Sequence, residues 1–197
     1  DQIWKIISFM NLIIFGPPGA GKGTQADFIV NKYNLYKLST GEVLRNEIKN
    51  ETNLGKEISS IINSGFLVSD QIVKKLVENF ISNKKFKNRL IFDGYPRNLN
   101  QAETLHELLK EYGQKIDLVL KLSVSLEIIK KRISERRSLE KREDDNEDIA
   151  VKRFKTYEKT TEPVIEYYKK LNLLKVIDGE RPIDQINKEI SDIISLI

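Results

Sequence analysis

The stretch of sequence that decides the fold is "GPPGAGKGTQ", from Gly16 to Gln25. An apolar run of strand length, Leu12 to Phe15, precedes it, and the helical sequence "ADFIV" follows it. A strand, a glycine-rich turn and a helix that starts near Lys22 place successive backbone N–H groups around the turn. These groups and the positive end of the helix dipole attract an anion. The turn therefore predicts a phosphate site.

The spacing of this stretch matches G-x-x-x-x-G-K, the phosphate-binding loop or P-loop, through Gly16, Gly21 and Lys22. Lys22 supplies a mobile positive charge near the phosphate that is transferred. The Ser or Thr that usually follows the lysine is Gly23 here, and Thr24 comes one position later. A hydroxyl bound directly to magnesium is therefore not expected, and the metal would rely on phosphates, waters and a carboxylate elsewhere.

Four apolar runs of strand length are separated by helical patterns. Such alternation predicts a parallel sheet covered by helices on both faces. We expect an α/β fold of three layers with five parallel strands. Asp93 ends the apolar sequence "RLIFD" and is the carboxylate expected to hold magnesium, through a water. The expected strands are Leu12 to Phe15, Arg89 to Phe92, Leu118 to Leu122, Leu173 to Ile177 and, more weakly, 35–39.

Apolar stripes with helical spacing are expected to face the core. Gly113 is the expected C-cap of the last of these helices, and the single histidine, His106, is expected on its surface. Residues 40–68 are expected to form a helical excursion between two strands. The stripes are Ile58, Ile61 and Ile62; Ile72, Leu76 and Phe80; and Leu105, Leu108 and Leu109.

The composition limits the class of protein. Hydrophobic residues are 40% and charged residues 31% of the 197 residues, which excludes a disordered or fibrous chain. The net charge of +4 is too small a bias to indicate nucleic acid. The absence of cysteine excludes disulfides, thiolate zinc sites and cysteine nucleophiles. No zinc is therefore expected.

The first apolar stretch, "IWKIISFMNLIIF", is too short to span a bilayer and has no small-residue cleavage site before the glycine turn. We therefore expect no membrane contact and a cytoplasmic protein. Met10 is a plausible natural start. Residues 1–9 are then expected to be a leader or a remnant of expression.

The turn resembles the nucleotide-binding signature of adenylate kinases and related nucleoside monophosphate kinases, in which glycine follows the lysine. Three further segments resemble signatures of that family, in the same order and at similar spacing. The resemblance covers the chain from Met10, and it implies a single domain over residues 10–197. The segments are "LSTGEVLR" at 38–45, "FDGYPRNLNQAE" at 92–103 and "REDDNEDIAVKRF" at 142–154.

The resemblance implies a helical insertion that binds the nucleoside monophosphate (NMP) at about 39–68 and a lid at about 135–146. The charged segment 135–145 reads either as a solvated loop or as a mobile cover for an anion. Only "SLEK" separates Arg137 from Lys141, so the lid resembles the short form.

The reaction implied is reversible, magnesium-dependent transfer of the terminal phosphate of ATP to AMP, giving two ADP without a phosphoenzyme. A nucleoside monophosphate has a second pKa of about 6, so its oxygen is a nucleophile at neutral pH without a general base. The site must neutralise charge, align two phosphates and exclude water. The partners implied are ATP, AMP and ADP, with no nucleic acid, and the protein is expected to be a monomer.

The resemblance places ATP on the P-loop and on arginines of a predicted helix. Arg132 and Arg136 lie four apart, on one face of the helix that follows the strand Leu118 to Leu122. By resemblance, Arg132 lies against the adenine and holds phosphate, and the backbone carbonyl of Arg181 contacts the same base. The ATP-binding residues implied are Gly16, Pro17, Gly19, Ala20, Gly21, Lys22, Gly23, Thr24, Arg132, Arg136 and Arg181.

Arg142 and Arg153 lie beyond the charged segment, eleven residues apart, which is close to three helical turns. The cap of that helix is expected at Asp144, Asp145 or Asn146, with Arg142 just ahead of it.

The transferring group and the monophosphate are also assigned to arginines by resemblance. Arg136, Arg142 and Arg153 would surround the transferring group, and Arg45 and Arg97 would hold the monophosphate. Planar guanidinium groups suit this role because they grip phosphate oxygens in pairs. The catalytic residues implied are Lys22, Asp93, Arg97, Arg132, Arg136, Arg142 and Arg153.

The choice of monophosphate rests on Thr40 and Gln101. In the family, these residue types face adenine, whereas uridylate and cytidylate kinases tend to have Ala and Asn. A glutamine amide carries both a donor and an acceptor for the adenine edge. Asn98, directly after Arg97, resembles the pyrimidine branch, so a UMP/CMP kinase is the alternative. The AMP-binding residues implied are Thr40, Gly41, Arg45, Gly65, Val68, Gly94, Arg97, Gln101, Arg142 and Arg153.

Two other classes of function are weaker. A nucleotide-binding regulator without catalysis would not need the complete set of Lys22, Asp93 and six arginines. A nucleic-acid-binding module is disfavoured because the basic residues gather around one phosphate site and lack interleaved aromatic residues.

Overall fold

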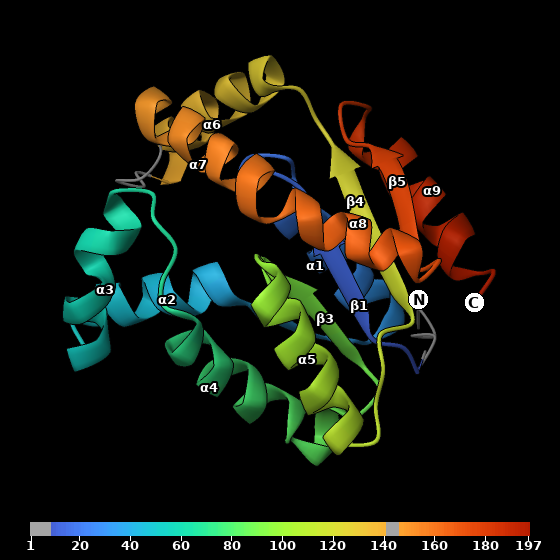
Figure 1. Cartoon of the computed structure of the whole chain (residues 1–197). Coiled ribbons are helices and arrows are strands. Elements are labelled where there is room, and N and C mark those ends of the chain that lie inside the picture. The colour runs from blue at the N-terminus through green and yellow to red at the C-terminus, as the bar shows by residue number, and fades with distance from the viewer. Residues whose placement is uncertain (1–8, 141–145) are drawn as a thin grey trace, which may run out of the picture.

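The computed structural model describes residues 9–140 and 146–197. Its centre is a sheet of five parallel strands in the order β2-β3-β1-β4-β5. This confirms the predicted fold class, with helices on both sides of a parallel sheet (Figure 1). The strands are β1 Leu12–Phe15, β2 Tyr36–Ser39, β3 Leu90–Asp93, β4 Leu118–Ser123 and β5 Leu174–Asp178.

Three strands, β2, β3 and β5, start one residue later than predicted. For β3 and β5 the reason is a turn that the sequence does not reveal. The backbone N–H of Arg89 closes a turn on the carbonyl of Phe86 at 2.9 Å, so Arg89 stays outside β3. The N–H of Leu173 likewise donates to Tyr168 at 3.2 Å, and β5 starts after it. Local turn closure therefore sets both boundaries.

The helices connect consecutive strands or cover the sheet (Figure 1). A short 3₁₀ helix at Lys84–Phe86 precedes β3. The α-helices are α1 Lys22–Tyr33, α2 Thr40–Lys49, α3 Asn53–Asn63, α4 Asp70–Ile81, α5 Leu99–Glu111, α6 Leu126–Glu140, α7 Glu147–Thr160, α8 Glu162–Lys170 and α9 Ile183–Ile194.

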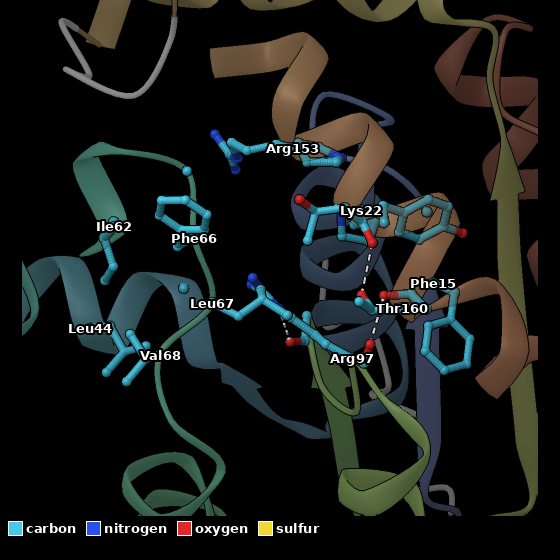
Figure 2. A pocket seen from close by; sticks show the side chains of 18 of the residues that line it. Phe15, Lys22, Leu44, Ile62, Phe66, Leu67, Val68, Arg97, Arg153 and Thr160 are labelled. Carbon is cyan, nitrogen blue, oxygen red and sulfur yellow. Dashed lines mark hydrogen bonds between the residues drawn. The ribbon is translucent and has the colours of Figure 1, made fainter. Parts of the chain in front are cut away.

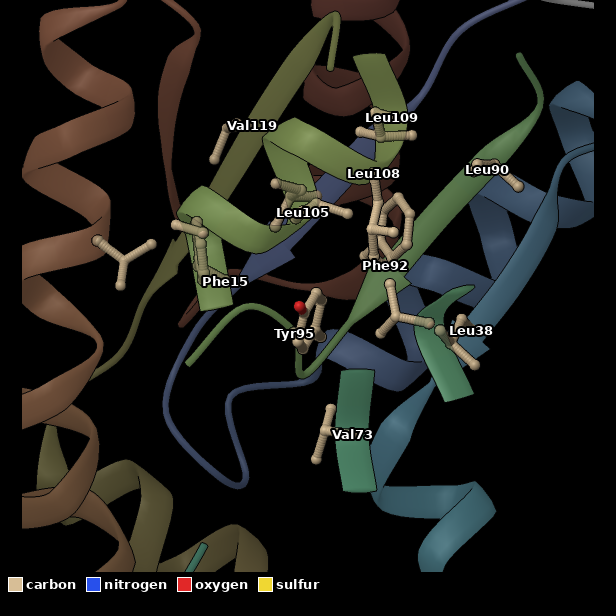
Figure 3. Close-up of a cluster of buried hydrophobic side chains, with 14 of the residues drawn as sticks. Phe15, Leu38, Val73, Leu90, Phe92, Tyr95, Leu105, Leu108, Leu109 and Val119 are labelled. Atoms are coloured by element: carbon tan, nitrogen blue, oxygen red, sulfur yellow. The ribbon is translucent and has the colours of Figure 1, made fainter. Parts of the chain in front are cut away.

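Alternating residues of β1 supply the two halves of the core. Ile13 and Phe15 belong to a buried cluster that also contains residues of α4, α5 and α8 (Figure 3). Leu12 and Ile14 belong to a second buried cluster with residues of α1, α6 and α9. The central strand is therefore apolar on both faces, as a covered parallel sheet requires.

The predicted stripe on α4 packs against the core, but the most buried residues of this helix lie one position later. Val73, Val77 and Ile81 are the buried residues of this helix, while Ile72 and Leu76 are only partly buried. The helix carries two adjacent apolar stripes, and periodicity alone does not say which one faces the sheet. The remaining member of the predicted stripe, Phe80, packs edge-on against Phe92 with ring centroids 5.9 Å apart.

The other helix predictions are confirmed. Leu105, Leu108 and Leu109 of α5 are buried, and Ile58 of α3 is buried with Ile61 and Ile62 packed beside it. His106 is exposed. Gly113 follows α5 with φ 64°, and the N–H groups of Gly113 and Gln114 donate to the last turn of the helix. This is the glycine-ended helix terminus that the sequence indicates.

Helices α2 and α3 lie within the segment predicted as the helical insertion and pack closely together. Thr52 caps α3, because its hydroxyl oxygen accepts from the N–H of Gly55 at 3.0 Å. A Cβ on Gly55 would overlap the carbonyl oxygen of Glu47, so this contact between the two helices requires glycine.

The predicted lid differs in one respect. Helix α6 continues to Glu140, so residues 135–140 are helical, in keeping with the strong helix formers in this stretch. Asn146 is the cap of α7, and its side-chain oxygen accepts from the N–H of Ile149 at 2.9 Å. Arg142, Asp144 and Asp145 lie outside the described residues.

Figure 1 shows α6 and α7 side by side beyond the carboxyl ends of the strands, with the pair of α2 and α3 on the left of the view. Ligands of parallel α/β sheets bind at these strand ends, where the strand order switches direction. Within the described part of the chain, no helix is both long and apolar enough to cross a membrane.

Candidate active site

The P-loop connects the carboxyl end of β1 to the first residue of α1, Lys22. Gly21, just before the helix, has φ 93°, a left-handed conformation that favours glycine. The Lys22 ammonium donates to the carbonyl oxygen of Pro17 at 3.1 Å, so the lysine folds back over the loop. The predicted strand, glycine turn and helix are therefore confirmed.

A charged cavity of about 1060 Å³ opens in front of this loop. P-loop residues form one wall and arginines from several elements form the others. Asp93, at the end of β3, is buried and also borders it. The predicted residues that line the charged cavity are Gly19, Gly21, Lys22, Gly23, Thr24, Gly41, Arg45, Asp93, Gly94, Arg97, Arg132, Arg136 and Arg153.

An apolar cavity of about 870 Å³ adjoins the charged one and extends toward α2, α3 and the segment after α3. Figure 2 shows Leu44, Ile62, Phe66 and Leu67 on one side of it. Gly16, Gly65 and Val68 also line it, as predicted residues of the site. An apolar wall with a few charged groups beside it is typical of a small-molecule site.

This apolar wall was not predicted from the sequence. Ile62 was expected in the core, and no role was predicted for Leu44, Phe66 or Leu67. The signal was the apolar sequence "GFLV" at 65–68, which follows α3 but is too short for a helix and pairs with no strand of the sheet.

The two cavities share a boundary formed mainly by cations. Lys22, Arg45, Arg97 and Arg153 border both, and they come from α1, α2, the segment after β3 and α7. In Figure 2, Arg153 and Arg97 approach the same space from above and below. Positive charge is therefore concentrated where the two cavities meet.

Like charges crowd each other at this boundary. Burial lowers the pKa of Lys22 to about 8; Asp93 opposes the shift, and Arg97, Arg153 and Arg136 add to it. Burial also lowers the pKa of Arg97 to about 10, with Arg153 and Arg45 adding to the shift and Asp93 opposing it. A bound polyanion would relieve this repulsion.

The depressed pKa of Lys22 predicts how stability depends on pH. Between about 8 and 10.5 the unfolded chain binds more protons at Lys22 than the folded protein, so stability rises with pH in this window. Below about pH 8 the charged lysine costs the folded state up to about 3 kcal/mol. Lys22→Met is therefore expected to stabilise the protein more at about pH 7.5 than at about pH 10.5.

Urea unfolding in a buffer without phosphate measures this difference. Lys56→Met, on the exposed face of α3, is the matched control and should change stability equally at both pH values. An equal effect of Lys22→Met at both pH values would contradict the prediction.

Arg132 of α6 connects two loops around the charged cavity. Its guanidinium donates to the carbonyl of Ala20 in the P-loop at 3.3 Å and to that of Gly179, after β5, at 2.9 Å. Arg136, one turn later, borders the same cavity. Arg181 borders neither cavity, and its side chain pairs with Glu189 of α9.

Arg97 is fixed at its base by neighbouring carbonyl and hydroxyl groups. Its Nε donates to the carbonyl of Gly94 at 2.7 Å, and the Thr40 hydroxyl donates to the same carbonyl at 2.9 Å. The Thr161 hydroxyl donates to the Arg97 carbonyl at 3.0 Å. The buried Thr40 and Arg97 therefore share one hydrogen-bond acceptor, the Gly94 carbonyl. Thr40 itself lines neither cavity.

Gln101 is buried and also lines neither cavity. Its side-chain oxygen accepts from the backbone N–H of Arg97 at 2.7 Å, and its amide nitrogen donates to Asp70 at 2.7 Å. Asn98 caps α5 by accepting from the N–H of Gln101 at 2.8 Å. This capping role explains the asparagine at position 98 without any contact to the base of the acceptor.

A family profile described as adenylate kinase matches residues 14–173. The chain belongs to the adenylate kinase family. It is similar to the adenylate kinase of Pelagibacter ubique, with 43% identity over 95% of this chain and 100% of that protein. It is also similar to the adenylate kinases of Prochlorococcus marinus, at 44% identity, and Fusobacterium nucleatum, at 39%.

Membership of the adenylate kinase family makes the protein a kinase, that is, a phosphotransferase. The match to the relative from Prochlorococcus marinus covers 91% of this chain and 96% of that protein. The match to the relative from Fusobacterium nucleatum covers 94% and 98%. The similarity therefore extends over both cavities and not over the P-loop alone.

Proposed function

We propose that this member of the adenylate kinase family transfers the terminal phosphate of ATP to AMP and forms two ADP. The observation that carries the proposal is the shared boundary of the two cavities. Four cations, Lys22, Arg45, Arg97 and Arg153, border both the charged and the apolar cavity. Two phosphates, one bound in each cavity, would come together at this boundary, between the four cations.

The donor phosphates would occupy the charged cavity, against the P-loop amides and Lys22. The acceptor would place its nucleoside in the apolar cavity and its phosphate near Arg45 and Arg97. An oxygen of the acceptor phosphate then attacks the terminal phosphorus of ATP as the bond to the leaving oxygen breaks. The arginines neutralise the charge and align the groups, and no general base is needed.

Magnesium is the cation that ATP carries in this family. Among the described residues, no group of three or more His, Cys, Asp and Glu side chains could hold a metal ion. The single buried carboxylate of Asp93 beside the charged cavity is compatible with magnesium held mainly by phosphates and waters. When bound, the ion would neutralise phosphate charge, and Asp93 would orient one of its waters.

The domain division and the lid remain part of this proposal. We infer that α2 and α3 cover the acceptor, and that the segment linking α6 and α7 covers ATP and brings Arg142 into the site. We also infer a monomer, because one chain supplies all four cations at the shared boundary of the cavities.

A direct assay of acceptors tests the function. With ATP and magnesium, ADP formation is expected to be at least about tenfold more efficient with AMP than with UMP, CMP or GMP, because a paired base edge is worth about 1–3 kcal/mol. Equal or better efficiency with UMP or CMP would contradict the assignment of AMP and support the alternative, a UMP/CMP kinase. Nucleotide binding without turnover of any acceptor would support the regulator instead.

A further inference from the structure

One carboxylate gathers three side-chain amides at the start of α4. The Asp70 oxygen Oδ1 accepts from Asn98 at 3.0 Å and from Gln101 at 2.7 Å, and Oδ2 accepts from Asn100 at 2.8 Å. This cluster joins the first residue of α4 to the first turn of α5. None of the four residues in this cluster lines the charged cavity.

The cluster fixes which way the Gln101 amide points. Its oxygen faces the backbone N–H of Arg97, which can only donate, and its NH₂ group faces Asp70, which only accepts when ionised. Burial opposes ionisation of Asp70, but the hydrogen bonds from Asn100, Asn98 and Gln101 outweigh it and lower its pKa. If the amide were flipped, its NH₂ group would face the N–H donor of Arg97, and its oxygen would face the carboxylate acceptor of Asp70.

One donor and one acceptor of the Gln101 amide remain after these contacts. A primary amide has two N–H donors and two oxygen lone pairs, and the cluster uses one of each. Adenine offers the complementary pair on its edge, because N1 accepts and the 6-amino group donates. A 6-oxopurine such as hypoxanthine has the reverse pair, because N1–H donates and O6 accepts.

We propose that Asp70 is a positioning residue that locks the Gln101 amide, so that the acceptor site selects 6-aminopurine over 6-oxopurine nucleotides. This inference rests on the proposed function and on the prediction, made from the family resemblance, that Gln101 faces the acceptor base. Two neighbours place the cluster beside the acceptor: Arg97, which donates to Gln101, and Val68, two residues before Asp70, both border the apolar cavity.

The test compares AMP with inosine monophosphate (IMP), which differ only in the 6-substituent and the N1 proton. In Asp70→Asn, residue 70 gains a donor that can face a flipped Gln101 oxygen. The ratio of kcat/KM for AMP to that for IMP is expected to fall about tenfold, the effect of roughly one charge-assisted hydrogen bond. The change should come from the KM of AMP and IMP, with the KM of ATP and the kcat for AMP within about twofold of wild type.

Asp184→Asn is the matched control, because it removes the same charge from the first turn of α9, away from both cavities. Its AMP-to-IMP ratio should equal that of wild type. Asp70→Ser also lacks the carboxylate, and it replaces Asp70→Asn if that variant does not fold.

An equal loss of kcat/KM with AMP and IMP would overturn the proposal, because a residue that only supports packing would weaken the binding of both acceptors alike. An unchanged ratio would overturn it too. Failure of the proposed function looks different, because wild type itself would then prefer another acceptor over AMP.

Discussion

Lys22→Met is expected to lower kcat for ADP formation by about 10²–10³-fold, the usual cost of removing one group that stabilises charge in the transition state. Among the residues that the structure describes, Lys22 is the only lysine that lines either cavity, and it lies where the two meet. Methionine keeps most of the apolar stem of the side chain and removes the charge. Steady-state rates with saturating ATP and AMP measure the effect.

The same substitution separates catalysis from folding. Because burial and the neighbouring arginines disfavour the charged form of Lys22, its removal should not lower the free energy of unfolding at neutral pH. Lys56→Met, at an exposed position of α3 that lines neither cavity, should leave kcat unchanged. A kcat within about threefold of wild type in Lys22→Met would remove Lys22 from the transferring step.

Local patterns made the sheet and the P-loop predictable. Short apolar runs gave four of the five strands clearly, because a strand covered on both faces is apolar throughout. The glycine spacing before Lys22 identified the loop, because the left-handed backbone conformation at Gly21 favours glycine at this position. Boundaries were less accurate where a turn hydrogen bond, such as that of Arg89, competes with strand pairing.

The parts that the sequence did not predict depend on contacts between distant segments. The apolar wall around Phe66 forms because α2, α3 and the following segment enclose a space that no single helix pattern describes. Asp70 reads as an ordinary acidic residue in the first turn of a helix, and only the fold brings Gln101 to it across 31 positions. The family resemblance named Gln101, but it did not reveal what orients the amide.

Arg97→Ala is expected to be the second large loss, about 10²–10³-fold in kcat/KM for AMP, with the KM of ATP nearly unchanged. Arg97 borders both cavities, and its Nε is anchored on the Gly94 carbonyl, so its guanidinium is held ready for a phosphate. Arg97→Lys should recover only part of the loss, because an ammonium cannot grip two oxygens in the planar geometry of a guanidinium.

The stability of the folded protein should change little in Arg97→Ala. The substitution loses about 1 kcal/mol of hydrogen bonding to Gly94, but it also removes a charge that burial and the neighbouring Arg153 and Arg45 disfavour, so the two effects offset. Arg89 is the matched control, because it donates to Asn34 and stacks on Tyr36 at 4.9 Å, away from both cavities. Arg89→Ala should lower stability and keep kcat. If Arg97→Ala instead lowers stability and keeps turnover, Arg97 is a structural arginine like Arg89, and the shared boundary of the cavities is not the place where phosphate is transferred.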